Sequence, residues 1–330
     1  MTQSKLLGQG TYGCVYYPSY SCDGKVKDKM YVSKLSKNNK AAQNEYDIGK
    51  LVKKIPNYSK KFLIVEKRCI IKQPQIDAIK TGCNFIKKRS YPSYVLLYSK
   101  YLKSRQLNDI LNEKQLTRYK ALEIIHSIYK RISQLYSVGV IHMDLHFANI
   151  LISKKHERVY IIDFGLSLDS NQFFKGDQIN LSYIDNKFFI NRPFTPSLTL
   201  EYIFICLMVK ENEELNKITI LETITEYYDY NKVIYTYLGE DYIKNTYEYY
   251  KSLEHNSRDT NIKLLLQYTN TWDYYKLAYY LLSDMDSFVL FDELKWLLLL
   301  MMHPIPSLRP TKEELQEHFK NYLELIKNKD

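Results

Sequence analysis

Asp144, Asn149 and Asp163 stand at the ends of two short apolar segments, where loop side chains can converge on one bound group. Asp144 and Asn149 precede a predicted strand over Ile150–Ile152, and Asp163 follows a second one over Val159–Ile162. Carboxylate and amide oxygens are the ligands that a hard cation such as Mg²⁺ prefers, and a loop carboxylate can also accept a proton. Helix capping or turn formation explains many loop aspartates, but it does not explain the joint spacing of these three residues.

A glycine-rich turn near the start of the chain is the second feature that could do chemistry. It reads GQGTYGCV, with Gly8, Gly10 and Gly13 followed two places later by Val15. Glycine permits tight backbone geometry and lets amide groups approach phosphate oxygens, although a plain hairpin turn would explain the pattern as well. No Gly-Lys-Ser/Thr sequence follows, which excludes a Walker loop, and no helical pattern starts at Gly13, which disfavours a dinucleotide-binding fold.

The elements that must position these motifs fall into two groups. Strands are predicted over Leu6–Gly10, Val15–Pro18, Met30–Leu35, Phe62–Glu66 and Tyr94–Tyr98. One helix is predicted among them, over Ala41–Lys53, and a long helical pattern begins at Glu113 and stops near Gly139. The chain therefore reads as a strand-rich first lobe and a helix-rich second lobe.

The motifs, taken in order, resemble those of the protein kinase superfamily. HMDLHFAN, from His142 to Asn149, resembles the HRDLxxxxN catalytic loop, and the DFG triplet at Asp163–Gly165 follows it, as in that family. The glycine-rich turn and a candidate lysine precede them in the right order. The resemblance implies an α+β, bilobal kinase-like fold, with a small β-rich N-lobe over residues 1–102 and a larger α-helical C-lobe over residues 103–330.

The resemblance also implies a chemistry, the transfer of the γ-phosphoryl group of ATP with Mg²⁺ as the cation. That reaction depends mainly on alignment and charge neutralisation. Asp144 would accept the proton of the acceptor hydroxyl or orient it, and Asn149 and Asp163 would hold the metal. Lys34 would bind the α and β phosphates, with Glu45 as its partner.

Alternatives remain for the lysine and for its acidic partner. Lys29 and Lys37 flank the same predicted strand, and Asp47 is close to Glu45 on the predicted helix. The 11-residue step from Lys34 to Glu45 is shorter than in most kinases. A solvated helix face would explain either acid without any function.

The nucleotide would lie between the glycine-rich turn and a hinge near Ser99–Leu102. The predicted contacts are Gly8, Gly10, Gly13, Val15, Lys34, Glu45, Ser99 and Tyr101. Ser99 would guard the back of the adenine pocket, and hinge backbone groups would hold the base. Cys14 could be a reactive thiol near the phosphates, although a plain small strand residue is the simpler interpretation.

Two substitutions depart from the kinase pattern. Met143 replaces the arginine that normally pairs with a phosphorylated activation loop, so phosphorylation of the Ser167–Ser182 region is not expected to be the main switch. His146 replaces the lysine that serine/threonine kinases place two residues after the catalytic aspartate. The loop also looks like those of antibiotic and choline-type phosphotransferases and of divergent kinases such as haspin. His146 would either contact the γ phosphate or pack locally.

The second lobe carries degenerate versions of three further kinase features. PSLRPT, with Arg309, resembles a signature near the last helices, whose arginine normally pairs with the glutamate of an APE motif. TPS stands in place of APE, so Glu201 is a candidate substitute one turn later. WDYYKLA resembles a helix start whose aspartate, here Asp273, braces the catalytic loop. Residues 210–262 would form an enlarged helical insertion.

Composition limits the class of protein. The 330 residues are 45% hydrophobic and 25% charged, and no apolar run of about 20 residues or signal-peptide core is present. An intracellular, cytoplasmic monomer without membrane contact is expected. The net charge of +10 comes without an arginine-rich arm or zinc-knuckle spacing, so specific nucleic-acid binding is not expected. Five cysteines without a CxxC pair favour reduced thiols over a disulfide framework.

These features predict an active kinase that phosphorylates Ser or Thr of protein substrates. The alternatives are a small-molecule phosphotransferase of the same fold and a non-catalytic binding module. The divergent motifs, the minimal length and a composition with 32 tyrosines, typical of AT-rich coding, resemble kinases of large eukaryotic DNA viruses. That resemblance would place the protein in a host cell or a virion.

Overall fold

The computed structural model describes residues 4–10, 13–72, 76–77, 79, 82–85, 93–111, 116–239, 241–283 and 291–327 of the chain. Thr11 and Tyr12 of the glycine-rich turn, and the predicted helix start at Glu113, lie outside the described residues. The chain forms two compact units. The first unit consists of residues 1–106 and 149–167, and the second consists of residues 107–148 and 168–330.

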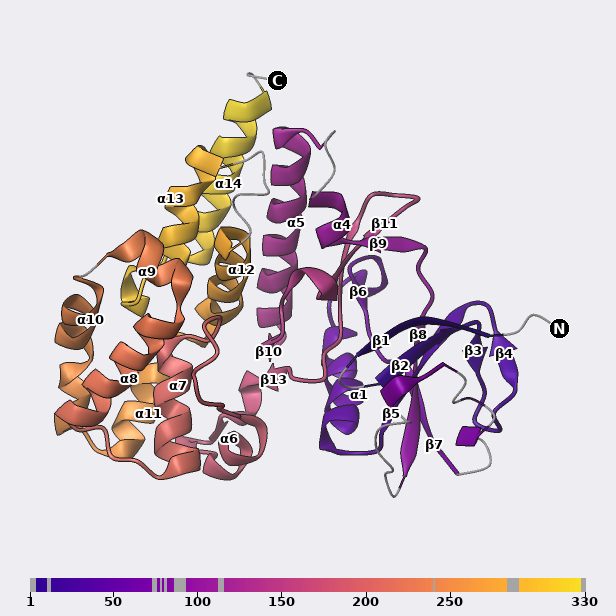
Figure 1. The fold of residues 1–330 in the computed structure, drawn as a ribbon, viewed down its shortest axis with the longest axis horizontal. Helices are drawn as coiled ribbons and strands as arrows, with labels where there is room; N and C mark the ends of the chain where they lie inside the picture. The colour runs from indigo at the N-terminus through magenta and orange to yellow at the C-terminus, as the bar shows by residue number, and fades with distance from the viewer. Residues whose placement is uncertain are drawn as a thin grey trace. The chain divides into compact units, whose positions relative to one another are not determined.

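A five-stranded antiparallel sheet with strand order β1-β2-β5-β8-β7 is the main layer of the first unit (Figure 1). Its strands are β1 (Lys5–Gly10), β2 (Gly13–Tyr17), β5 (Tyr31–Lys37), β7 (Lys67–Ile71) and β8 (Tyr94–Lys100), while β3 (Ser19–Tyr20) and β4 (Val26–Asp28) form a separate ribbon. Lys34 stands opposite Val15 on one neighbouring strand and opposite Leu97 on the other. Directly opposite residues point to the same face of a sheet, so these three side chains share one face.

Helix α1 (Lys40–Val52) packs on the face of the sheet that carries Lys34, and it agrees with the predicted helix to within one residue. Its first turn is capped by Asn39, whose side-chain oxygen accepts a hydrogen bond of 3.0 Å from the backbone N–H of Ala42. Ala42 then packs with Val95 and Leu97 of β8. This packing fixes the helix on which Glu45 lies.

A second sheet in the first unit has the order β6-β12-β11-β9, from β6 (Phe62–Leu63), β9 (Ser104–Gln106), β11 (Ile150–Ser153) and β12 (Val159–Ile162). The predicted strand over Phe62–Glu66 was too long. The observed strand, β6, has only two residues and pairs in parallel with β12. The edge of the main sheet is instead β7, whose mixed charged and apolar sequence gave no strand signal. Because β9 and β11 pair, residues 103–106 and 149–167 belong to the first unit, unlike in the predicted division after residue 102.

Two disulfide bonds tie the first unit together, which shows that the expectation of reduced thiols was wrong for four of the five cysteines. Cys14 is bonded to Cys83 and Cys22 to Cys69, across sequence separations of 69 and 47 residues. Cys206 is free and buried. The sequence could not reveal these pairs, because only the folded sheet brings cysteines so far apart into contact. A bonded Cys14 is also not the reactive thiol that was considered.

Removal of the Cys14–Cys83 bond should lower the free energy of unfolding by about 2–4 kcal/mol, because the bond restricts a long loop of the unfolded chain. The Cys14→Ser/Cys83→Ser variant can be compared with the wild type by urea denaturation. Reductant should lower the urea midpoint of the wild type. It should leave the midpoint unchanged in a variant that lacks both disulfide bonds. A wild-type midpoint that does not respond to reductant would contradict the prediction.

Helices make up most of the second unit (Figure 1). They are α4 (Leu107–Leu111), α5 (Arg118–Tyr136), α6 (Leu181–Lys187), α7 (Leu200–Cys206), α8 (Lys217–Tyr230), α9 (Lys232–Leu238), α10 (Tyr242–Tyr250), α11 (Arg258–Leu266), α12 (Trp272–Ser283), α13 (Phe291–Met301) and α14 (Lys312–Lys327). Short strands β10 (Val140–Ile141) and β13 (Leu168–Asp169) pair with each other, as do β14 (Phe174–Lys175) and β15 (Gln178–Ile179). The strand-rich first unit and the helical second unit confirm the predicted α+β class.

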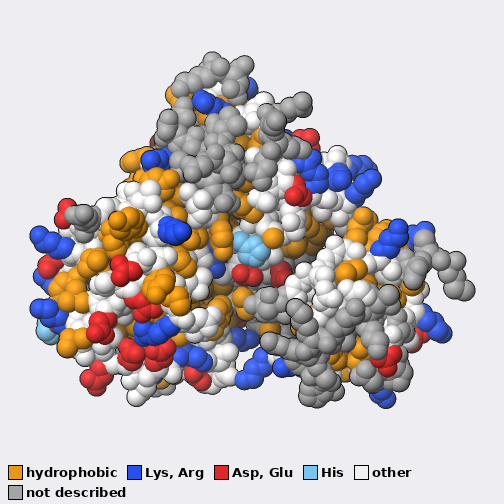
Figure 2. All heavy atoms as spheres, viewed as in Figure 1, with side chains coloured by type: hydrophobic (Ala, Val, Ile, Leu, Met, Phe, Trp, Pro, Cys, Tyr) orange, Lys and Arg blue, Asp and Glu red, His pale blue; other side chains and the backbone are white. Residues whose placement is uncertain are grey.

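The core of the second unit forms around α12, which packs against α5, α9 and α13. The apolar residues of α5 recur at helical spacing and are buried from Ala121 to Leu135, as the sequence predicted, and Thr117 caps the helix. None of the described helices has the length and hydropathy needed to cross a membrane. On the face that Figure 2 shows, acidic and basic side chains of this unit are intermixed.

Candidate active site

Lys34 lies at the centre of a partly buried ionic cluster in the first unit. Its ammonium donates hydrogen bonds of 3.0 Å to Glu45 Oε2 on α1 and of 3.0 Å to each carboxylate oxygen of Asp163. Lys29 is exposed, and Asp47 pairs at the surface with Lys50. The structure therefore favours Lys34 over Lys29 and Glu45 over Asp47.

Burial and charge act in opposite directions on this cluster. Burial is the largest influence on the pKa of Lys34 and lowers it, but the charges of Glu45 and Asp163 outweigh burial and raise the pKa overall. Burial raises the pKa of Glu45 above its ordinary value, and Lys34 opposes that shift. The Lys34 ammonium therefore stays charged, ready to bind an anion such as a phosphate.

The segment after Asp163 is held by a residue that no motif indicated. Asn44, on α1 beside Glu45, donates hydrogen bonds of 3.1 Å to the Gly165 carbonyl and 2.8 Å to the Ser167 carbonyl. Asp163 itself has a φ of 62°, in the left-handed region that non-glycine residues seldom occupy. One helix thus carries the partner of Lys34 and also holds the backbone that follows Asp163.

Two features of the first unit suit a bound nucleotide with Mg²⁺. Asp163 and Asn149 both belong to this unit and supply carboxylate and amide oxygens, and Mg²⁺ is usually held by one or two carboxylates together with phosphates and waters. No atom of the described residues lies within 4 Å of a Cβ added to Gly8 or Gly10, so none of them packs against these two positions of β1. Gly13 differs, because its φ is 150° and a Cβ there would lie 2.1 Å from the Leu35 carbonyl oxygen.

Of the two predicted hinge residues, Ser99 is near the end of β8 and Tyr101 directly follows it. Ser99 is within the strand, opposite Val32, and so points to the same face as Lys34. Tyr101 stacks on Tyr17 with ring centroids 3.7 Å apart, and its N–H donates to the Met30 carbonyl at 2.8 Å. The Tyr101 amide is therefore already engaged, and the assignment of Ser99 and Tyr101 to an adenine site stays a prediction.

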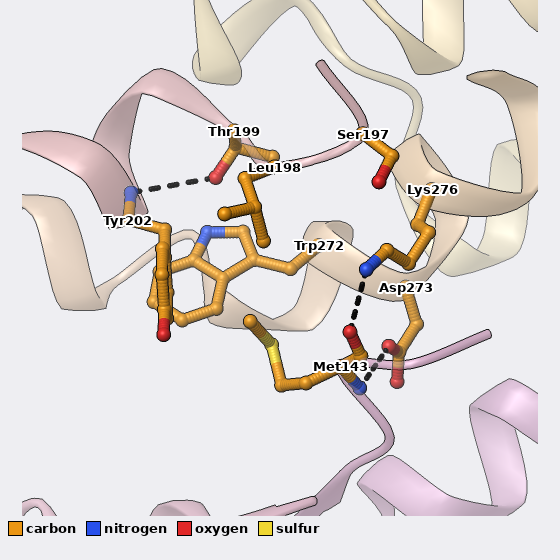
Figure 3. A pocket seen from close by; sticks show the side chains of 8 residues that line it. All are labelled: Met143, Ser197, Leu198, Thr199, Tyr202, Trp272, Asp273 and Lys276. Carbon is orange, nitrogen blue, oxygen red and sulfur yellow. Dashed lines mark hydrogen bonds between the residues drawn. The ribbon is translucent and has the colours of Figure 1, made fainter. Parts of the chain in front are cut away.

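In the second unit, the loop that carries Asp144 is held by α12. Asp273 accepts hydrogen bonds from the backbone N–H of His142 at 2.6 Å and of Met143 at 2.9 Å. The bracing role predicted for Asp273 is therefore confirmed. Lys276, one turn further along α12, donates a hydrogen bond of 2.6 Å to the Met143 carbonyl (Figure 3). No motif had indicated Lys276.

His146 lies beside Asp144 in the second unit. Its Nε2 is 3.9 Å from Asp144 Oδ2, and its ring centroid is 6.1 Å from that of Tyr280 on α12. Both the Asp144 and the His146 side chains are partly exposed. The exposure leaves the pair accessible to a substrate, as contact with the γ phosphate would require, and the role of His146 stays a prediction.

Arg309 and Glu201 form a buried ion pair, which confirms the predicted substitute for the APE glutamate. Arg309 Nη2 is 2.9 Å from Glu201 Oε1, at side-chain exposures of 2% and 0%. Arg309 also donates a hydrogen bond of 2.9 Å to Thr271 Oγ1 and one of 2.8 Å to the His303 carbonyl. The guanidinium carbon lies 5.1 Å from the centroid of the Tyr275 ring.

Most of the described residues between 210 and 262 are helical, as predicted, and they support the segment before α7. The Tyr227 hydroxyl of α8 lies 2.9 Å from the Pro196 carbonyl and 2.6 Å from the Leu198 carbonyl and can donate its one hydrogen to either, and the Asn231 side-chain amide donates to the Pro196 carbonyl at 2.9 Å. Tyr227 also meets the Tyr275 hydroxyl at 2.5 Å. These helices are therefore part of the core of the second unit and hold the segment that contains Ser197.

Comparison with known families now defines the class of this protein. The protein kinase domain family matches residues 1–184, more than half of the chain. The chain therefore belongs to the protein kinase family. That match covers the glycine-rich turn, the Lys34 cluster and the loop that carries Asp144.

Two curated proteins illustrate the similarity. A probable LIM domain-containing serine/threonine-protein kinase of Dictyostelium discoideum is 38% identical over 76 residues, which is 22% of this chain and 12% of that protein. Ribosomal protein S6 kinase 2 alpha of Gallus gallus is 36% identical over 78 residues, which is 22% of this chain and 10% of that protein. The match thus spans about a tenth of the length of these relatives. Neither relative is viral, and the resemblance to viral kinases stays a prediction.

Proposed function

We propose that this protein transfers the γ-phosphoryl group of ATP to Ser or Thr hydroxyls of protein substrates and requires Mg²⁺. The observation that carries the proposal is the Lys34 ammonium shared between Glu45 and Asp163. Such a cluster fixes a cation beside a carboxylate, which suits phosphate oxygens and a metal at one site.

Each residue has a role in this proposal. Lys34 binds phosphate oxygens, and Glu45 keeps its ammonium in place. Asp163 and Asn149 hold Mg²⁺, which when bound neutralises charge on the phosphates. Asp144 accepts the proton of the acceptor hydroxyl, or orients that hydroxyl for in-line attack.

The choice of a Ser/Thr acceptor has its support in the relatives. One of them carries serine/threonine-protein kinase in its name, and the other is named as a kinase of ribosomal protein S6. A small-molecule acceptor is the second candidate, since His146 rather than a lysine stands beside Asp144. The intracellular location, the monomeric state and the absence of nucleic-acid binding stay predictions.

The test is phosphate transfer from labelled ATP with and without Mg²⁺, using a cell lysate as the source of acceptors. Phosphopeptides detected by mass spectrometry would support the proposal, whereas labelled metabolites would support the second candidate. Neither product would indicate a non-catalytic module.

The Lys34→Met and Asp163→Asn variants should each abolish most of the Mg²⁺-dependent transfer, because each removes one partner of the cluster. Lys37→Met, on the same strand, and Asp47→Asn, on α1, are matched controls that should keep the wild-type rate. Equal activity of the wild type, Lys34→Met and Asp163→Asn would show that the two roles are assigned wrongly.

A further inference from the structure

Lys276 is a buried lysine beside Asp144 that the roles above do not use. The residue is 7% exposed, on a helix whose other buried residues are mainly apolar or aromatic. A lysine ammonium has three N–H donors, and one of them binds the Met143 carbonyl. The other two have no hydrogen-bond acceptor among the described residues. Burying an ammonium is strongly unfavourable unless its charge is compensated, so this position calls for a physical reason.

The first reason lies in the backbone of Met143. Its φ of 62° is unusual for a non-glycine residue and is unfavourable by itself, so the surrounding structure must hold it. Asp273 accepts from its N–H, and Lys276 donates to its carbonyl. Asp273 and Lys276 are three residues apart and therefore share one face of α12. Together they bind both polar groups of the residue that directly precedes Asp144.

The second reason is charge. Burial lowers the pKa of Lys276, and the carboxylates of Asp144 and Asp273 act against that shift. Lys276 thus supplies a positive charge to a loop whose own sequence has Met143 and His146 where the resemblance predicts basic residues. Its ammonium also borders a cavity of about 10 Å³, lined by Ser197 and Thr199 as well (Figure 3). That volume suits about one water molecule, which could accept from one of the two remaining N–H groups.

We propose that Lys276 is a positioning residue for phosphate transfer, which holds the Met143 carbonyl and so aims the Asp144 carboxylate at the acceptor hydroxyl. This inference rests on the proposed kinase function and adds a residue from α12 to the acceptor side of the site. Lys276 acts through the loop and does not bind the nucleotide.

The test compares Lys276→Met and Lys276→Gln with the wild type. Lys276→Met removes the donor and the charge, and it should lower kcat for peptide phosphorylation about a hundredfold, since small misplacements of catalytic groups have effects of that order. Lys276→Gln keeps a neutral N–H donor for the Met143 carbonyl, and its kcat should be about tenfold higher than that of Lys276→Met. The Kd of a fluorescent ATP analogue should not change, because Lys34 and Asp163 belong to the first unit. Lys263→Met, at an exposed position on α11, is the control and should match the wild type.

Each outcome decides the question. If the wild type transfers no phosphate, the kinase function fails, and this inference fails with it. If the wild type is active and a folded Lys276→Met keeps kcat within threefold, only the role of Lys276 is wrong. A weaker Kd for the ATP analogue at unchanged kcat would also contradict it. If neither variant folds by circular dichroism, Lys276 supports the fold and not the acceptor side, which overturns the proposal.

Discussion

Asp144→Asn should lower kcat for phosphate transfer by about 10²- to 10⁴-fold, the usual contribution of a positioned acid or base. The substitution keeps the size of the side chain and removes its charge and its capacity to accept a proton. Nucleotide affinity should stay close to that of the wild type, because Asp144 lies in the second unit and the Lys34 cluster lies in the first. The loop itself should keep its shape, since Asp273 and Lys276 bind the backbone of its neighbours.

The measurement is steady-state phosphorylation of a peptide together with equilibrium binding of an ATP analogue. Asp185→Asn is a matched control, because Asp185 is an exposed acid of the same unit that pairs with Lys210 at the surface. The control should keep the wild-type kcat. If Asp144→Asn weakens the binding of the ATP analogue and leaves kcat intact, Asp144 serves the nucleotide and the assigned role is wrong.

The motif residues could be placed from the sequence because each motif carries its own local geometry. Lys34 was placed by the two-residue period of a strand, which puts it on one face with Val32. Glu45 could not be separated from Asp47 by the sequence, since both lie on one short helix. Only packing decided, because α1 turns Glu45 toward the sheet and leaves Asp47 at the surface.

Asn44 and Lys276 were missed because neither belongs to a motif. Their contacts join a helix to a loop more than a hundred residues away in the sequence, Asn44 to Gly165 and Lys276 to Met143. A usable signal existed for Lys276, since it is a lone charge inside the apolar and aromatic run after Asp273. A charge at such a position must find a buried partner.

The disulfides and the sheet edges were mispredicted for a related reason. Strand β6 and strand β7 are both short, and which sheet each one joins depends on distant residues. Likewise, the Cys14–Cys83 pair depends on where a remote segment returns to β2. Local propensity carries no information on such long-range pairing.

Arg309→Met should lower the free energy of unfolding by about 3–5 kcal/mol, the largest stability effect expected for a single substitution in this protein. The Glu201 carboxylate would remain fully buried without its cation. Thr271 and the His303 carbonyl would lose their hydrogen bonds to the guanidinium as well. Urea denaturation followed by circular dichroism measures the change, and Lys251→Met, at an exposed lysine, should stay within about 0.5 kcal/mol of the wild type.

The double variant Arg309→Met/Glu201→Met separates the cost of a broken pair from the value of the intact one. Replacing a whole buried ion pair by apolar residues is often neutral, whereas removing one partner leaves an uncompensated charge. The surroundings favour such a replacement, since Tyr227, Tyr250 and Tyr275 are buried in the same region. The double variant should therefore be more stable than Arg309→Met alone. If it is less stable by the sum of the two single effects, the two side chains do not interact, and Glu201 does not replace the APE glutamate as the partner of Arg309.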